Sequence, residues 1–252
     1  MSYRPLADAP SWFLRALAVP QGDLEVEVDG CTIHALTFGA PGSRGLVFVH
    51  GGGAHAHWWT HVAATFSDEY RVVCIDLSGH GDRVSGAIVC DSPVTEPDPE
   101  IASYRLKEAF GQPRIYPTEA EAFAHFRTVP AQDHYLDYVM HHVAHQSIRP
   151  TEGGVQWKFD RDVFAQFGGG MRSVALPYLS RVQCRFALLR SEHGLVTPDI
   201  GRFMYETLGR VTPVIEIPEA GHHAMLDQPL ILLTALRTLL GDWDHSEPRR
   251  RS

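Results

Sequence analysis

Four short stretches of this 252-residue chain hold residue types that could carry acid–base chemistry and stabilise an anion. The glycine run 51–53 follows His50, His222 follows Gly221, and carboxylates stand at Asp91 and Glu192. A histidine can take and return a proton near neutral pH, and a carboxylate can orient its ring. A glycine-rich turn can present backbone N–H groups to a developing oxyanion. What these stretches do depends on the elements that position them.

A second group of histidines could suggest a metal site. It comprises His134, His141, His142 and His145, and the pair His141 and His145 has the i, i+4 spacing of helical ligands. No glutamate lies between that pair, so the H-E-x-x-H pattern of zinc enzymes is absent. The spacing favours polar histidines on a helix surface, and we predict neither a metal nor a cofactor.

Composition favours one globular α/β domain with an inserted subdomain. The chain is 44% hydrophobic and 21% charged, and it is long enough to bury a core. Its formal net charge of -8 argues against nucleic acid and anionic membranes as partners. The basic run 249–251 is typical of a solvated, frayed end.

Cysteine usage predicts a reducing compartment. The four cysteines are Cys31, Cys74, Cys90 and Cys184, none in a C-x-x-C pair and three in apolar runs. We therefore expect reduced thiols in a cytoplasmic protein. The N-terminal stretch lacks the apolar run of a signal peptide, and no apolar stretch approaches the length of a membrane span.

Hydrophobic periodicity predicts a mostly parallel sheet. Residues 24–28 alternate as a half-buried strand does, and residues 31–38 form a hairpin partner across Asp29-Gly30. Continuous apolar runs predict buried strands over 45–49, 71–76, 86–90, 184–190 and 212–217. Helices are expected over 57–67 and about 223–240.

Between Asp91 and about Leu179 the strand–helix alternation stops and later resumes. Prolines are frequent first, and helices are then expected over 100–110, 118–127, 131–146 and 160–166. We interpret this block as a helical lid. The predicted organisation is an N-terminal core part (1–91), a lid insertion (92–179) and a C-terminal core part (180–252).

These stretches resemble the α/β-hydrolase superfamily in their order. Val49-His50-Gly51-Gly52-Gly53 resembles its oxyanion loop, Asp76-Leu77-Ser78-Gly79-His80-Gly81 its D-x-x-G-x-G turn, and Ala220-Gly221-His222-His223 its catalytic-histidine loop. The resemblance covers about residues 24–243. The segment with Phe126-Arg127 and Trp157-Lys158-Phe159-Asp160 is similar to lids of this superfamily and names no substrate.

The resemblance implies a role for each motif. His222 would be the general base, and the backbone N–H of Gly52, shaped by Gly51 and Gly53, would bind the oxyanion. The acid would be Asp91, after the sixth family strand, or Glu192, after the seventh. Gly194 occupies the position that usually holds aspartate. His223 is expected to support the loop, and Trp58 and Trp59 to pack in the core or line a pocket.

The nucleophile that the resemblance requires is absent. The family places it in a G-x-S-x-G elbow, yet no Ser, Cys or Asp of this chain has glycine at both -2 and +2. Ser78, Ser85 and Ser191 all fail this test. The turn at Asp76 runs almost directly into 86–90, so one strand, the elbow and two helices of the usual core are missing, on the order of 50–60 residues.

The gap falls near Asp82 and Val84. An in-frame deletion between two copies of a tripeptide like His80-Gly81-Asp82 would produce it. The nine residues from Leu77 to Ser85 span about 30 Å when extended, enough to cross as a stretched coil. We expect strand 86–90 to slide into the vacant slot beside Val47–Val49, because an open slot would leave two strand edges unpaired.

Three hypotheses about function follow. The first is an internally deleted, impaired or inactive hydrolase whose relatives cleave esters, amides or C–C bonds of small apolar substrates. The second is a non-catalytic protein that binds a small apolar molecule in the lid pocket. The third is an enzyme with a substitute nucleophile such as Ser78, Ser85 or Ser92. A deletion also predicts low stability and exposed apolar surface.

Overall fold

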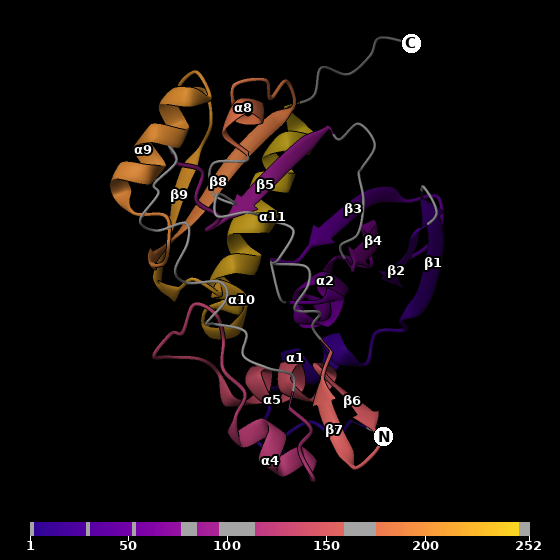
Figure 1. Ribbon diagram of the computed structural model, residues 1–252. Helices are drawn as coiled ribbons and strands as arrows, with labels where there is room; N and C mark the ends of the chain where they lie inside the picture. The colour runs from indigo at the N-terminus through magenta and orange to yellow at the C-terminus, as the bar shows by residue number, and fades with distance from the viewer. Residues whose placement is uncertain are drawn as a thin grey trace. The chain divides into compact units, whose positions relative to one another are not determined.

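The computed structural model describes residues 3–28, 31–51, 54–76, 85–95, 114–158 and 175–246 (Figure 1). The chain divides into two compact units, and each is described by itself. The first unit comprises residues 1–82, 106–131 and 135–166. The second comprises residues 83–105, 132–134 and 167–252.

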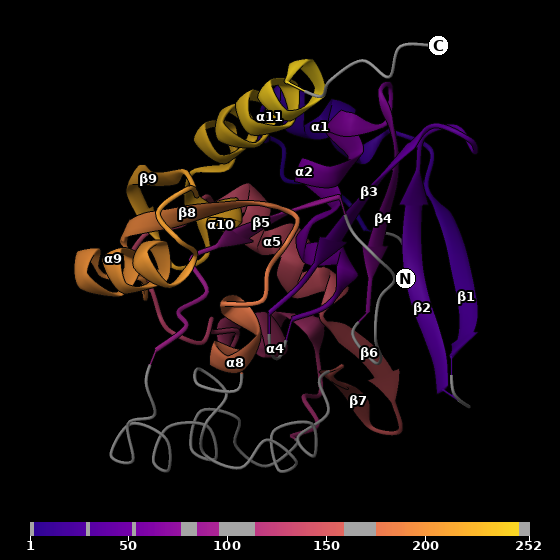
Figure 2. The ribbon, with the colours of Figure 1, turned by 90° about the horizontal axis from the view of Figure 1, so that it is seen from above.

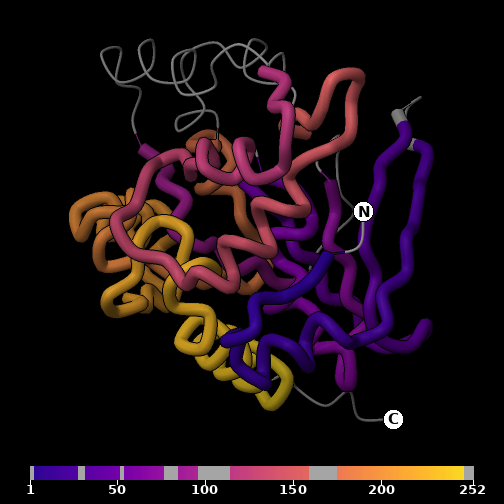
Figure 3. Tube along the Cα trace, turned by 90° about the horizontal axis from the view of Figure 1, so that it is seen from below, coloured from indigo at the N-terminus to yellow at the C-terminus, as the bar shows by residue number. Residues whose placement is uncertain are grey.

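The first unit contains a four-stranded sheet in the order β1-β2-β4-β3. Its strands are β1 (Gly22–Val28), β2 (Cys31–Phe38), β3 (Arg44–Val49) and β4 (Tyr70–Ile75). β1 and β2 form the predicted antiparallel hairpin, the long indigo pair in Figure 3, while β3 and β4 are parallel. The Asp29-Gly30 turn lies outside the described residues.

The helices that precede β1 and that follow β3 are short. α1 (Ser11–Leu17) precedes β1. η1 (Ala56–Trp58), α2 (Thr60–Ala63) and η2 (Ala64–Phe66) take the place of the single helix that we predicted over 57–67. Two 3₁₀ turns flank a single α-helical turn, which is a common way for a short helix to begin and end. Phe13, Leu36, Val62 and Phe66 are fully buried and form much of the core of this unit.

The inserted segment of the first unit is part helix and part sheet. It contains α4 (Glu119–Ala124), α5 (Asp137–Gln146) and the antiparallel pair β6 (Ile148–Thr151) and β7 (Gly154–Trp157). The prediction of a purely helical insertion is therefore wrong over 148–157, where Gly153, with φ of 86°, allows a tight turn between the strands. The helices expected over 100–110 and 160–166 lie outside the described residues.

The second unit is a three-layer α/β structure. Its sheet has the order β5-β8-β9, with β5 (Gly86–Cys90), β8 (Arg185–His193) and β9 (Val214–Gly221) all parallel. The helices are α8 (Leu176–Leu179), α9 (Pro198–Thr207), α10 (Ala224–Asp227) and α11 (Pro229–His245). Figure 2 shows α9 on one side of this sheet and α11 on the other. Pro229 divides the single C-terminal helix that we predicted into α10 and α11.

The expected pairing of strand 86–90 with Val47–Val49 is wrong. All five residues of β5 pair with β8, from Gly86 opposite Arg185 to Cys90 opposite Leu189. β3 pairs with β4, and among the described residues no strand pairs with its other side. β3 and β5 are therefore each an edge strand of their own sheet.

The two edges of the first sheet differ in how they are protected. β1 carries Asp23, Glu25 and Glu27, charges that oppose pairing with another chain. β3 has Arg44 at its start and then only glycine and apolar residues, with the Val47 side chain 53% exposed. An exposed apolar edge of this kind favours association between chains.

We predict that Val47→Lys lowers self-association and the binding of an apolar-surface dye, because a charge on the edge opposes strand addition. Sedimentation and dye fluorescence would measure both. Val26→Lys on β1, where Val26 is also exposed, is the matched control and should change little. Equal effects of the two variants would contradict the assignment of β3 as the adhesive edge.

The first unit also buries a cluster of histidines. His142 on α5 is 3% exposed, and neither of its ring nitrogens has a hydrogen-bond partner among the described residues. Its ring lies 4.9 Å from the Tyr3 ring, 6.0 Å from that of Phe13 and 6.5 Å from that of His57, measured between centroids. The prediction of a polar helix-surface histidine is therefore wrong for His142.

Burial favours the neutral form of these rings. It lowers the pKa of His55 to about 3 and of His57 to about 4, and the positive charge of Lys158 adds to both effects. Burial also holds the pKa of His142 well below its ordinary value, with further lowering by neighbouring histidines. An unfolded chain would protonate the same rings near their ordinary pKa of about 6.5.

We predict that the free energy of unfolding falls as the pH drops from about 6.5 towards 4. In that window the unfolded chain binds protons that the folded chain excludes, and each such proton contributes about 1.4 kcal/mol per pH unit. Urea unfolding at several pH values measures this slope. His142→Leu should reduce it by about one proton, whereas His193→Leu, at an exposed site, should not. A slope unchanged in His142→Leu would refute the assignment.

Candidate active site

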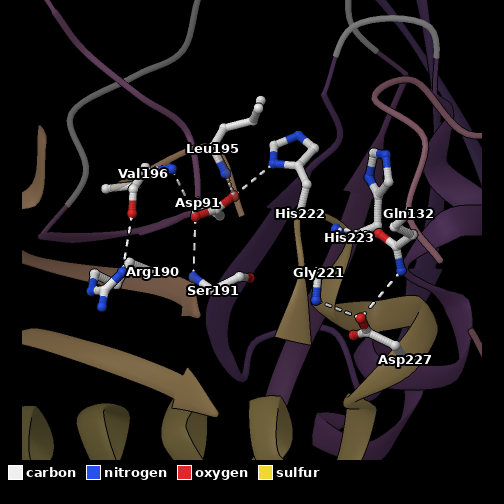
Figure 4. Close-up of polar contacts among 10 residues, drawn as sticks. All are labelled: Asp91, Gln132, Arg190, Ser191, Leu195, Val196, Gly221, His222, His223 and Asp227. Carbon is white, nitrogen blue, oxygen red and sulfur yellow. Dashed lines mark hydrogen bonds and ion pairs between the residues drawn. The ribbon is translucent and has the colours of Figure 1, made fainter. Parts of the chain in front are cut away.

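Asp91 is the centre of the hydrogen bonding at the carboxyl end of β5. It is 2% exposed, and its φ of 43° places it in the left-handed region that aspartate tolerates better than most residues. Its carboxylate accepts hydrogen bonds from the backbone N–H groups of Ser191 (3.0 Å), Leu195 (2.7 Å) and Val196 (3.2 Å) (Figure 4). The loop after β8 is thus folded around this side chain.

His222 completes the group. It directly follows β9, and its Nδ1 lies 2.8 Å from Oδ2 of Asp91. Since an ionised carboxylate only accepts, Nδ1 carries the proton and Nε2 is left with a free lone pair. Within the described part of the chain Nε2 has no hydrogen-bond partner. This arrangement of a buried acid orienting an imidazole is that of a general base.

Gly194 explains why the acid stands at Asp91. A Cβ built on Gly194 would lie 2.2 Å from Oδ2 of Asp91. The space that a side chain at 194 would occupy is therefore filled by the Asp91 carboxylate. Glycine at 194 and aspartate at 91 are a complementary pair, because only one carboxylate fits beside His222.

The structure brings His222 together with Asp91 and not with Glu192. Oε2 of Glu192, which is exposed, accepts a hydrogen bond from the backbone N–H of Glu219 at 2.9 Å. No hydrogen bond or ion pair joins Glu192 to His222. Glu192 instead holds the backbone of β9 at Glu219, which has a positive φ of 57°.

The predicted oxyanion loop belongs to the first unit and is described only in part. Nδ1 of His50 donates to the carbonyl oxygen of Gly51 at 2.7 Å, so His50 forms a hydrogen bond within the loop. Burial lowers the pKa of His50. Gly52 and Gly53 lie outside the described residues, and their role stays a prediction. Trp58 and Trp59 are both buried.

Asp76 fixes the start of the turn that follows β4. Its carboxylate accepts from Nδ1 of His34 at 2.7 Å and from the backbone N–H of Ala56 at 2.7 Å. Burial by itself would raise the pKa of Asp76, but these two hydrogen bonds outweigh burial and hold the pKa below its ordinary value. The aspartate of the turn motif therefore ties β2, β4 and η1 together.

No described hydroxyl or thiol acts as a partner of His222. Ser85 and Ser92 flank β5, Ser191 is buried and gives its backbone N–H to Asp91, and Ser78 lies outside the described residues. Burial raises the pKa of Cys90 to about 12, so its thiol stays protonated and unreactive at neutral pH. Among the described residues no group of three or more His, Cys, Asp or Glu side chains could hold a metal ion.

Two residues beside His222 were missed by the sequence reasoning. Asp227 and Gln132 hydrogen-bond to the backbone on either side of His222. A signal for Asp227 existed: it is a carboxylate in an apolar segment, five residues after His222 and just before a helix that starts with proline. Gln132 carries no local signal because it lies 91 residues from His223.

None of the helices in the described ranges is both long and apolar enough to cross a membrane.

Comparison with known proteins agrees with this fold. A match to the alpha/beta hydrolase family covers residues 46–110. The chain is 34% identical over 80 residues to a fluoroacetate dehalogenase from a Burkholderia species, covering 32% of this chain and 23% of the relative. It is 48% identical over 58 residues to a 2-succinyl-6-hydroxy-2,4-cyclohexadiene-1-carboxylate synthase from Citrobacter koseri, covering 21% of this chain and 23% of the relative.

A solved structure extends the similarity. E-2-(acetamidomethylene)succinate hydrolase has a TM-score of 0.76 at 16% identity, covering 88% of this chain and 100% of that one. The chain thus has the α/β-hydrolase fold, and its residues 46–110 match the alpha/beta hydrolase family. The matched region spans less than a quarter of the curated relatives, 23% of each.

We predict that Gly194→Ala lowers the free energy of unfolding by at least about 1 kcal/mol, because the new methyl group displaces a buried carboxylate from its backbone donors. Gly241→Ala, at a helical glycine with open space around it, is the control and should be neutral or stabilising by up to about 1 kcal/mol. Urea unfolding compares the two. Equal stability of Gly194→Ala and the unsubstituted chain would contradict the complementarity of Gly194 and Asp91.

Proposed function

We propose that this chain is a hydrolase-fold protein that retains the acid and base of a serine-hydrolase site but lacks the nucleophile, and that it is therefore impaired or inactive as a hydrolase. One observation carries the proposal. Asp91 and His222 form a 2.8 Å hydrogen bond in a chain whose full sequence contains no G-x-S-x-G elbow.

The chemistry open to such a pair is limited. In a complete site, Nε2 of the histidine takes the proton of a hydroxyl that attacks the substrate carbonyl, and a covalent intermediate follows. Here Nε2 of His222 would have only water to activate. A positioned general base contributes about 10²–10⁴-fold, far below the rate of a complete hydrolase, so we expect at most slow cleavage of activated esters.

The proposed ligand is a small apolar molecule bound in the predicted lid pocket. The relatives carry names of a dehalogenase, a synthase and a hydrolase, activities on small molecules. On this scaffold an intact pocket without a nucleophile would bind such a molecule and release it unchanged. A non-catalytic binding protein is thus the alternative outcome of the same proposal.

The missing segment is proposed to be an internal deletion near Asp82 and Val84. Two observations support it: β3 and β5 are each an edge strand of their sheet, and the stretch from Leu77 to Ser85 is only nine residues long. Parallel strands of one sheet normally need a crossover of a dozen residues or more. The acid and base survive because both lie C-terminal to the gap.

The proposal is tested with a fluorophosphonate probe and a p-nitrophenyl ester. We expect no covalent adduct by intact mass, and ester hydrolysis either absent or slow and reduced in His222→Ala and in Asp91→Asn to the same extent. The matched control is His193→Ala, which changes an exposed histidine of the same unit and should leave any rate unchanged.

Stoichiometric labelling of a serine, lost in His222→Ala, would overturn the proposal and establish a substitute nucleophile. Isothermal titration with small apolar esters then separates the two remaining outcomes. Saturable binding without turnover supports a binding protein, and no binding supports an inactive remnant.

A further inference from the structure

The peptide groups on both sides of His222 are held by side chains. Oδ2 of Asp227 accepts a hydrogen bond from the backbone N–H of Gly221 at 2.6 Å. Oε1 of Gln132 accepts one from the backbone N–H of His223 at 2.9 Å. The residue between these two anchors is the proposed general base (Figure 4).

The two anchors are joined to each other. Nε2 of Gln132 donates to Oδ2 of Asp227 at 3.2 Å and to the carbonyl oxygen of His134 at 2.9 Å. These two bonds fix the orientation of the Gln132 amide, because its nitrogen faces acceptors and its oxygen faces the His223 N–H. Gln132 and Asp227 therefore form one hydrogen-bonded clamp across the residue they flank.

The clamp is buried and closely packed. Asp227 is 8% exposed, and burial raises its pKa although the backbone hydrogen bonds oppose the rise. A Cβ at Gly221 would lie 3.0 Å from the Gln132 amide and 3.1 Å from Oδ2 of Asp227. Glycine at 221 thus permits the close approach of both side chains to the backbone.

We propose that Gln132 and Asp227 are positioning residues that hold the His222 ring on Asp91. This inference rests on the proposed role of His222 as the base. The backbone torsions at 222 set where Nδ1 points, and the clamp fixes the peptide on each side of that residue. Gln132, from the segment between β5 and β8, thereby contributes to the geometry of a loop at the end of β9.

The test measures how fast the Nδ1 proton of His222 exchanges with water, by NMR of the whole chain. Gln132→Met removes the amide at similar length, and Asp227→Ala removes the oxygen that accepts from both the Gly221 N–H and Nε2 of Gln132. We expect exchange at least about tenfold faster in each variant, since loss of the anchors lets the ring leave the Asp91 carboxylate. No substrate is involved, so the result is independent of whether the chain turns over an ester.

Two controls separate positioning from stability. Leu239→Ala weakens the core of the same unit at a buried residue of α11, and should not accelerate exchange at equal loss of thermal stability. Asp227→Asn is the conservative variant: its amide oxygen can replace Oδ2 as acceptor for the Gly221 N–H and for Nε2 of Gln132, and exchange should stay slower than in Asp227→Ala.

Unchanged exchange in both single variants would overturn the proposal. So would equal acceleration in Leu239→Ala, which would reduce the clamp to a contribution to stability. A His222 Nδ1 proton too labile to detect in the unsubstituted chain would also overturn it, because the clamp would then not hold the ring. The chain could prove inert towards esters and ligands while the clamp variants still accelerate exchange. That result would contradict the proposed function and would support the positioning role.

Discussion

The second unit depends on one buried carboxylate. The Asp91 carboxylate accepts hydrogen bonds from three backbone N–H groups of β8 and of the loop that follows it. It also accepts one from the Nδ1–H group of His222. A buried charge is costly unless hydrogen bonds satisfy it, so this set of donors is what allows an aspartate at a 2% exposed position. The same donors fix the ends of three strands relative to one another. The hydrogen bonds of Asp91 therefore determine both how these strand ends are arranged and how the His222 ring is oriented.

The location of this centre explains what the chain keeps and what it lacks. Asp91 follows β5, and His222 follows β9. The backbone groups that donate to Asp91 lie near the end of β8 and in the loop after it. These three strands form one sheet. All of them come after the point at which the family's elbow should stand. The proposed deletion would therefore leave the acid and base assembled, and it would leave β3 as an apolar edge in the other unit.

Much of the fold follows from the sequence because strands buried on both faces are continuous apolar runs. The hairpin of β1 and β2 and the parallel strands were predicted within a few residues. The β6–β7 hairpin was missed because its strands are short and one contains Pro150, which weakens a strand pattern. The break before Pro229 was missed because leucines continue across it.

The site was less predictable, since it depends on contacts between distant residues. The geometry favours Asp91 over Glu192 through a positive φ at 91 and through the space that Gly194 leaves. The sequence shows the glycine at 194, but it does not show that the Asp91 carboxylate fills this space. The pairing of Gln132 with the histidine loop spans 91 residues and needs coordinates. The absence of an elbow, by contrast, is a property of the sequence alone.

The account's central claim is that Asp91 and His222 form an assembled acid–base pair in this chain without a nucleophile. The most direct measurement is the proton NMR signal of the His222 Nδ1–H in the unsubstituted chain and in Asp91→Asn. The account predicts a strongly downfield signal in the unsubstituted chain that moves upfield or disappears in Asp91→Asn and is absent in His222→Ala. A chain without that signal, or a signal unchanged by Asp91→Asn, would contradict it.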